Sequence, residues 1–235
     1  DKETVYLKEI RDQQNWPDDV FLYYAKNSGD RVVEISNILK EMTHVSMSRQ
    51  SMNEIVLKNT KRANMSDESY VKIQKQLEER NVEPLVELIY PLPGETRASF
   101  LEGLEEILLQ VNPLKTDFRF YLAEMLPGAE MATTETRKSF GLKTAWRRLS
   151  GYVGDFDGVP ISEYEEIIVT TNDFSLDDYK FVRRLNLILA VFLSYRLFKP
   201  IMQLVIKNAK PKVMQLMVSI TDALMESEEY SEFIY

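Results

Sequence analysis

Short apolar runs alternate with longer segments of helical periodicity through the first half of the chain. The apolar runs lie at 20–24, 44–50, 84–90 and 118–122. Their length and their flanking turn residues predict strands. The segments between them predict helices that begin near Asp30, span 53–61, run from about Ser66 to Arg80, and span 96–111. This order predicts an α/β fold with a parallel sheet, either open or closed into a partial (β/α) barrel.

The pattern changes after Gly128. A short helical piece is expected at 145–149 and a short strand at 166–170. Ser175 and the acidic residues after it form a capping-box pattern, which opens a long apolar helix expected to end before Pro200. A last helix is expected to begin near Pro211. We therefore divide the chain into a partial barrel at 1–130 and a mainly helical C-terminal extension at 131–235.

Composition narrows the classes of function. Apolar residues make up 44% of the 235 positions and charged residues 28%, which is typical of a globular protein. The net charge is −8 and no basic stripe is visible, so we expect no nucleic-acid partner. With no cysteine in the chain, neither disulfides nor thiolate-bound metals can form from it alone. A single histidine, His44, disfavours a histidine-rich zinc site.

The chain carries no pattern of a secretory leader, and no apolar run approaches the ~18–20 residues that span a bilayer. We therefore expect a cytoplasmic protein without a transmembrane segment. The first residues look like the end of a helix that began earlier. We expect the chain to be a piece of a longer protein.

Candidate chemistry lies where ligands bind in parallel α/β folds, at the carboxyl ends of strands. Alternation places Ser46, Ser48 and Gln50 on one face of the second strand, where hydroxyl and amide groups suit a ribose. A helix cap with a solvated loop explains the same residues. Arg62 follows at the end of the next helix and suits a carboxylate, although it also fits an ordinary surface cation.

Two further strand ends carry polar groups. Glu87 lies inside an apolar strand, where a carboxylate needs a partner, and Glu95 and Thr96 then open a helix. A neighbouring cation paired with Glu87 is the plainer alternative. Arg119 and Tyr121 alternate with phenylalanines on the last strand, which fits either an anion clamp facing the barrel interior or an edge strand with a solvated face.

Three segments of the chain resemble radical S-adenosylmethionine (SAM) enzymes, of the class that often carries an N-terminal cobalamin-binding domain. The segments are 48–53 (SRQSMN), 61–64 (KRAN) and 87–96 (ELIYPLPGET), in matching order and spacing. Segments 126–132 and 165–171 resemble the region that follows the barrel in that class. The resemblance covers about residues 1–200. It implies a partial (β/α)6 barrel that holds SAM against a four-iron, four-sulfur cluster.

The resemblance also implies roles for the cofactor-binding residues. Gln50 and Ser48 would contact the ribose or methionine part of SAM, Arg62 would pair with the methionine carboxylate, and Glu87 would reach the ribose hydroxyls. Ile89 would pack on the adenine.

Leu122 and Ala123 would continue the adenine contact from the last strand, while Arg119 and Tyr121 would face the substrate. The parent would then be an iron–sulfur oxidoreductase or methyltransferase that cleaves SAM reductively, with cobalamin as a further cofactor in some members.

Several features depart from the family pattern. The CxxxCxxC loop that ligates the cluster should lie upstream of Asp1, so the fragment alone is expected to be inactive and to partner the missing N-terminal half of the same protein. Pro91 stands where glycine is common, and Arg49 where an aliphatic residue is usual. The exposed strand edge at 20–24 could also pair with a second copy.

Two other classes of function remain open on sequence alone. The chain could be a non-catalytic scaffold or interaction protein with a degenerate barrel. It could also be a barrel hydrolase that uses Glu87 and Glu95 as paired carboxylates.

Overall fold

The computed structural model describes residues 2–22, 29–39, 42–46, 48–79 and 82–227. Its first part contains α1 (Lys2–Gln14), β1 (Val20–Leu22), α2 (Gly29–Leu39), β2 (Thr43–Ser46), α3 (Glu54–Asn59), α4 (Asp67–Glu79), β3 (Pro84–Tyr90), α5 (Arg97–Gln110) and β4 (Asp117–Leu122). The expected alternation of strands and helices is therefore confirmed for this part of the chain.

The four strands form one parallel sheet in the order β1-β2-β3-β4. Parallel neighbours in sequence order are the arrangement of a partial β/α fold, and the described strands do not close into a full barrel. The strands β1 and β4 lie at the two edges. The pairing of β3 with β4 sets Glu87 opposite Arg119 and Ile89 opposite Tyr121.

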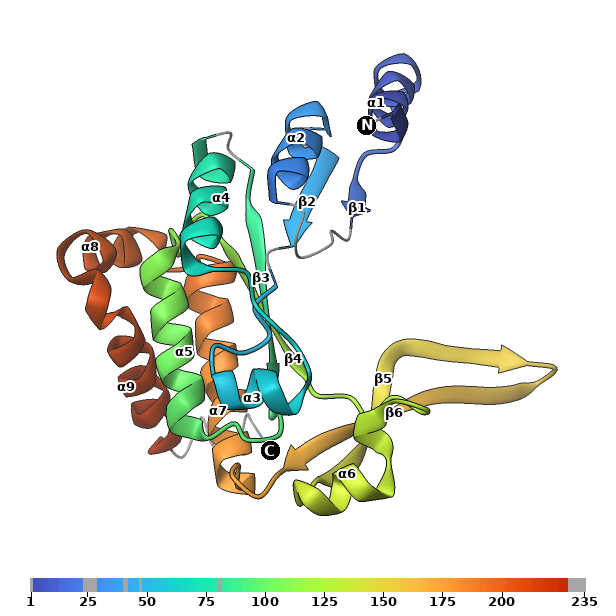
Figure 1. Cartoon of the computed structure of the whole chain (residues 1–235), viewed down its shortest axis with the longest axis vertical. Coiled ribbons are helices and arrows are strands. Elements are labelled where there is room, and N and C mark those ends of the chain that lie inside the picture. The colour runs from blue at the N-terminus through green and yellow to red at the C-terminus, as the bar shows by residue number, and fades with distance from the viewer. Residues whose placement is uncertain (1, 23–28, 40–41, 47, 80–81, 228–235) are drawn as a thin grey trace.

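One face of the sheet builds the core. Val86 and Leu88 on β3 and Phe118 on β4 are buried, together with apolar residues of α4, α5, α7 and α9. These helices gather on one side of β3 and β4 (Figure 1). Since strand side chains alternate between faces, Glu87 and Ile89 are left on the opposite face, away from the helices.

The second part of the chain begins with η2 (Glu130–Ala132) and α6 (Thr134–Ser139). A long antiparallel ribbon follows, formed by β5 (Lys143–Phe156) and β6 (Val159–Thr170). The ribbon extends away from the helices and the parallel sheet (Figure 1). The last elements are α7 (Leu176–Leu189), η3 (Ala190–Ser194), α8 (Lys199–Ala209), η4 (Lys210–Lys212) and α9 (Val213–Met225).

Several local expectations were wrong. Residues 145–149 lie in β5 and not in a helix. The strand expected at 166–170 is present, but it is only the end of the twelve-residue β6. The strand expected at 44–50 ends at Ser46. The helix that opens at Ser175 does end before Pro200, at Leu189 with η3 reaching Ser194, but Pro200 then lies in the first turn of α8, a helix that was not expected. Residues 23–24 of the first expected strand lie outside the described part.

Among the described helices, none alone has the length and apolar content that a membrane span needs. Taken together, Leu176–Ser194 and Lys199–Met225 meet the length and composition criteria as one pair, bent by 94°.

Candidate functional site

A cavity of about 450 Å³ lies at the carboxyl ends of β3 and β4. It is lined by Gln50, Thr60, Arg62, Ile89, Leu92, Tyr121, Leu122, Ala123, Glu124, Leu126, Ala129, Glu130 and Met131. This volume is in the range of small-molecule sites, and its position is the one at which parallel α/β folds bind ligands.

Most of the residues expected at a cofactor site meet at this cavity. Those that line it are Gln50, Arg62, Ile89, Leu122 and Ala123, and Tyr121, which was expected to face the substrate, lines it as well. The lining does not include Ser48, which is half-buried in the loop before Gln50, nor Glu87 and Arg119, which lie further down the same face of the sheet. The structure therefore brings Gln50 and Arg62 together and places Glu87 below them.

Gln50 is held by its backbone and has a free side-chain acceptor. Its carbonyl oxygen accepts a hydrogen bond of 3.1 Å from the amide of Ile89, which ties the loop after β2 to β3. Its Oε1 atom is buried and has no hydrogen-bond partner. An unsatisfied buried acceptor costs free energy, so a ligand that donates a hydrogen bond there would be favoured.

Arg62 follows α3 and is exposed at the rim of the cavity. Its amide donates to the carbonyl of Leu57 at 2.8 Å, which fixes the end of the helix. Its guanidinium forms no ion pair with any described residue. The neighbouring Lys61 is instead paired with Glu130 at 2.5 Å. Arg62 is thus the uncommitted cation of this rim.

Glu87 interacts with polar side chains of its own sheet face. The hydroxyl of Ser46 donates a hydrogen bond to its Oε2 at 2.5 Å. The Tyr121 side chain hydrogen-bonds with both Glu87 and Arg119, and burial raises the pKa of Tyr121. The expected cation partner of Glu87 is not the main contact, because the Nε of Arg119 is bonded to Asp117 at 3.2 Å.

Arg119 and Tyr121 are both largely exposed on β4, an edge strand. This position matches the solvated-edge alternative, and both side chains are accessible to another molecule although they hydrogen-bond with neighbours on the same face.

Glu95 has a structural role that the sequence did not reveal. It is 1% exposed, and its Oε2 accepts a hydrogen bond of 2.6 Å from the Ser51 hydroxyl, while its Oε1 accepts one from Ser99. Burial raises its pKa, and the hydrogen bonds from Ser51 and Ser99 oppose that effect. Both carboxylate oxygens are therefore used to join the loop after β2 to the start of α5. Glu95 has no free oxygen to serve as the second carboxylate of a hydrolase.

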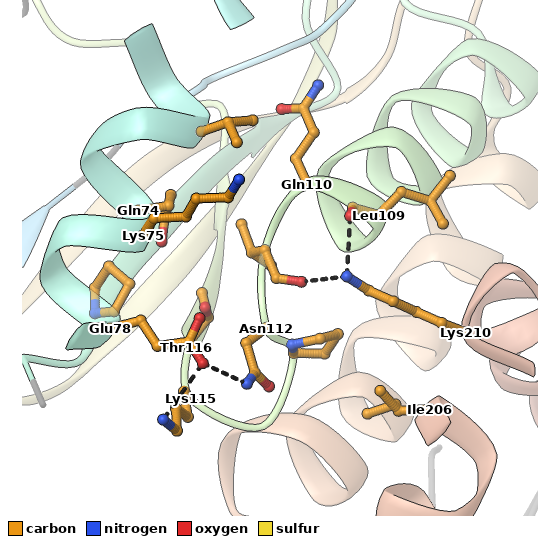
Figure 2. A pocket seen from close by; sticks show the side chains of 14 residues that line it. Gln74, Lys75, Glu78, Leu109, Gln110, Asn112, Lys115, Thr116, Ile206 and Lys210 are labelled. Carbon is orange, nitrogen blue, oxygen red and sulfur yellow. Dashed lines mark hydrogen bonds and ion pairs between the residues drawn. The ribbon is translucent and has the colours of Figure 1, made fainter. Parts of the chain in front are cut away.

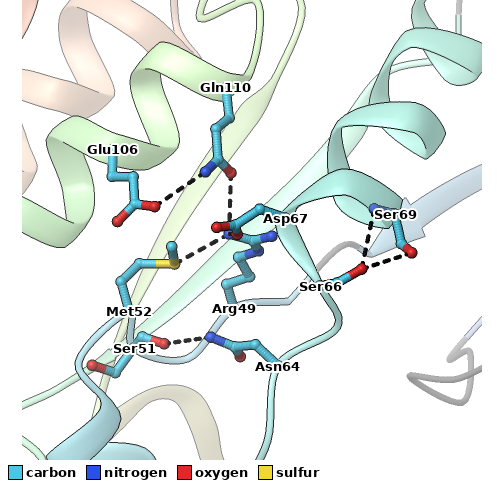
Figure 3. Close-up of polar contacts among 9 residues, drawn as sticks. All are labelled: Arg49, Ser51, Met52, Asn64, Ser66, Asp67, Ser69, Glu106 and Gln110. Carbon is cyan, nitrogen blue, oxygen red and sulfur yellow. Dashed lines mark hydrogen bonds and ion pairs between the residues drawn. The ribbon is translucent and has the colours of Figure 1, made fainter.

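Arg49 anchors the same loop from the other side. It is 1% exposed, and its Nη1 lies 2.7 Å from Asp67 and 3.1 Å from Gln110 (Figure 3). Its guanidinium also lies 3.8 Å from the centre of the Tyr70 ring, and burial raises the pKa of Tyr70 to about 12. Arg49, which stands where the resembled family usually has an aliphatic residue, thus connects the loop that carries Gln50 to α4 and α5.

The chain is similar to two curated methyltransferases. It is 34% identical over 176 residues to the cobalamin-dependent radical SAM methyltransferase TokK of Streptomyces tokunonensis. This match covers 73% of this chain and 25% of TokK. It is 33% identical over 178 residues to 2-(S-pantetheinyl)-carbapenam-3-carboxylate methyltransferase of Streptantibioticus cattleyicolor, with coverage of 74% and 25%. The chain therefore spans about a quarter of the length of these relatives. No protein-family model matches it.

These relatives support the resemblance to radical SAM enzymes that the motifs indicated. Both relatives are named as methyltransferases, and one of them as a cobalamin-dependent radical SAM enzyme.

Proposed function

We propose that this chain supplies one wall of a SAM pocket in a radical SAM methyltransferase. The observation that carries the proposal is the single cavity shared by Gln50, Arg62, Ile89 and the 122–123 segment. The similarity to TokK supports it independently.

The residues of the cavity fit the parts of SAM. Ile89, Leu92 and Leu122 offer apolar surface for the adenine ring. The orphaned Oε1 of Gln50 would accept a hydrogen bond from a ribose hydroxyl or from the ammonium group. The uncommitted guanidinium of Arg62 would pair with the carboxylate. Glu87 would act through Tyr121, which hydrogen-bonds with Glu87 and lines the cavity.

This chain has no residues that could ligate the four-iron, four-sulfur cluster. The sequence has no cysteine, and the described residues include no group of three or more histidine, cysteine, aspartate or glutamate side chains that could hold a metal ion. We therefore assign the ligands of the four-iron, four-sulfur cluster to a preceding polypeptide. Bound at such a cluster, SAM supplies the radical chemistry, while this chain binds and orients its nucleoside and amino-acid ends.

The substrate and a second cofactor, cobalamin, also belong to the proposed full-length enzyme. The name of TokK motivates cobalamin in the full-length enzyme, and no residue of this chain is assigned to it. Arg119 and Tyr121 would face the substrate from the exposed end of β4. The edge strand β1 would pair with the preceding polypeptide or with a second copy. On its own the chain is expected to be inactive.

Titration calorimetry with SAM and with S-adenosylhomocysteine tests the pocket without requiring turnover. We expect saturable binding to the chain, weakened roughly tenfold by Arg62→Met through loss of a charge-assisted pair. Gln50→Leu should also weaken binding, because the ligand loses its acceptor. Arg148→Met removes an exposed cation on the ribbon and should change nothing. Absence of binding, or equal affinities for the wild-type chain and Arg62→Met, would overturn the proposal.

A further inference from the structure

Gln50 lies between two buried neighbours in the loop that follows β2. Arg49 and Ser51 are 1% and 3% exposed, whereas Gln50 is only partly buried and lines the proposed SAM pocket. Neither Arg49 nor Ser51 lines that pocket. The two neighbours therefore hold the loop from inside the protein while the Gln50 side chain meets the cavity.

The loop after Gln50 is held through Ser51. The Ser51 hydroxyl donates to Glu95 at 2.6 Å and accepts from the amide of Asn53 at 3.1 Å. Its carbonyl oxygen accepts from the side-chain amide of Asn64 at 2.8 Å (Figure 3). These bonds fix the chain on the C-terminal side of Gln50. On the N-terminal side the corresponding contacts are those of the Arg49 side chain.

The two residues that receive the Arg49 guanidinium stand at the ends of helices. Asp67 is the first residue of α4 and Gln110 is the last residue of α5. The amide group of Gln110 is oriented by Glu106, to which its Nε2 donates at 3.2 Å, so that its oxygen is left for Arg49 (Figure 3). Figure 2 shows the same end of α5, where the Nζ of Lys210 donates to two carbonyl oxygens at 2.9 and 2.7 Å. Arg49 is thus attached to a fixed part of the fold.

Stability alone does not account for a buried arginine here. Its Nε and Nη2 atoms are buried without a hydrogen-bond partner among the described residues, so desolvation of the guanidinium is only partly offset. Apolar side chains of similar volume often replace buried ion pairs without loss of stability. Asp67 is 60% exposed and could return to water if Arg49 were replaced. An apolar side chain, however, could not hydrogen-bond to both α4 and α5, and so could not fix the direction of the loop.

We propose that Arg49 is a positioning residue for SAM, which keeps the Gln50 side chain at the cavity by tying the loop before it to α4 and α5. The inference rests on the proposed function, in which the ligand at Gln50 is SAM. It makes SAM affinity depend on a side chain that does not line the pocket.

Titration calorimetry of the full chain with SAM tests this dependence. Arg49→Met keeps an apolar chain beside Tyr70 and loses the guanidinium. We expect it to weaken SAM binding about fivefold, within the range of couplings between neighbouring residues. The double variant Arg49→Met/Gln50→Leu should bind no more weakly than Gln50→Leu, because no acceptor is left to position. Arg49→Met/Arg62→Met should instead show the product of the two single losses, since Arg62 follows a different helix.

Arg196→Met is the matched control. Arg196 forms an ion pair with Glu83, which precedes β3 at the end of the sheet opposite the cavity, and neither residue lines the pocket. This substitution should lower the urea midpoint of unfolding and leave the SAM affinity unchanged, which separates loss of an ion pair from loss of positioning.

The outcomes distinguish this inference from the proposed function. Equal SAM affinities for the wild-type chain and Arg49→Met, or losses that multiply in Arg49→Met/Gln50→Leu, would overturn the positioning role and leave the pocket standing. Absence of SAM binding by the wild-type chain would overturn both.

Discussion

At the residue scale, Arg137 and Glu166 form a two-pronged ion pair that joins α6 to β6. The Nη1–Oε1 and Nη2–Oε2 distances are 2.6 and 2.7 Å, and the Thr144 hydroxyl donates to Oε1 at 2.5 Å. The hydrogen bonds from Arg137, followed by the one from Thr144, lower the pKa of Glu166 from 4.5 to about 2. The carboxylate is therefore stabilised by folding in its charged form.

Arg137→Met should destabilise the fold in a pH-dependent way. At pH 7 we expect Arg137→Met to unfold at a lower urea concentration than the wild-type chain, by a small margin because the pair is exposed to solvent. Because the folded pKa of Glu166 is depressed, its stabilising contribution is present above pH 4.5 and is lost as the pH falls towards about 2. Urea unfolding of both proteins across this range measures the difference.

Lys138→Met is the control for Arg137, since Lys138 is exposed on the same helix and forms no ion pair with a described residue. A stability difference for Arg137→Met that grows with acid would contradict the assignment.

Some site residues could be predicted from the sequence, because their motifs lie at or next to strand ends. The family resemblance predicted that Gln50, Arg62 and Glu87 would surround one ligand. Gln50 and Arg62 line one cavity together with Ile89, whereas Glu87 does not line it. The structural roles of Arg49 and Glu95 were not predicted, because their partners are far away in the chain. Arg49 contacts Gln110, 61 positions later, and Ser51 reaches Glu95 across 44 positions. No local pattern encodes such pairs.

At the element scale, the beginning of α7 confirms a signal read from sequence. Ser175 accepts a hydrogen bond from the amide of Asp178, and the Asp178 side chain accepts one from the amide of Ser175. This reciprocal capping box satisfies two backbone donors that would otherwise lack partners. The helix it starts carries core residues that include Phe181 and Leu185.

Ser175→Ala should therefore lower the free energy of unfolding by about 1 kcal/mol, the usual loss for an N-cap serine. Ser219→Ala is the matched control, because Ser219 is exposed within α9, where alanine has the better helix propensity. Chemical denaturation followed by circular dichroism compares the two. Equal destabilisation by both substitutions would show that the cap contributes nothing specific.

The β5–β6 ribbon shows why one element was missed. A strand with one buried face alternates apolar and polar residues, but this ribbon exposes both faces over much of its length. Its exposed apolar residues are Trp146, Val153, Phe156, Val159, Ile161 and Tyr164. Without a buried face there is no period of two, so the sequence around Arg147 and Arg148 was read as helical.

At the scale of the whole molecule, the parallel sheet is open at both edges. Strand β4 continues only as a single antiparallel bridge from Glu124 to Ile167, and β1 has no outer neighbour among the described strands. The cavity at the ends of β3 and β4 is lined from the loop after β2, the end of α3, β3, β4 and the segment 124–131. Under the proposed function, this cavity would hold the nucleoside end of SAM although the chain has no cysteine.

Reconstitution with iron and sulfide tests whether a preceding polypeptide holds the cluster while this chain binds SAM. The chain alone, incubated without oxygen, should remain colourless because it has no cysteine ligands. A longer polypeptide that includes the preceding region should carry a CxxxCxxC motif and turn brown. In that longer protein, Arg62→Met should leave the brown colour unchanged and weaken SAM binding, since Arg62 serves the carboxylate and not the iron. A preceding region without the cysteine motif, or loss of the cluster on substitution of Arg62 alone, would contradict this division.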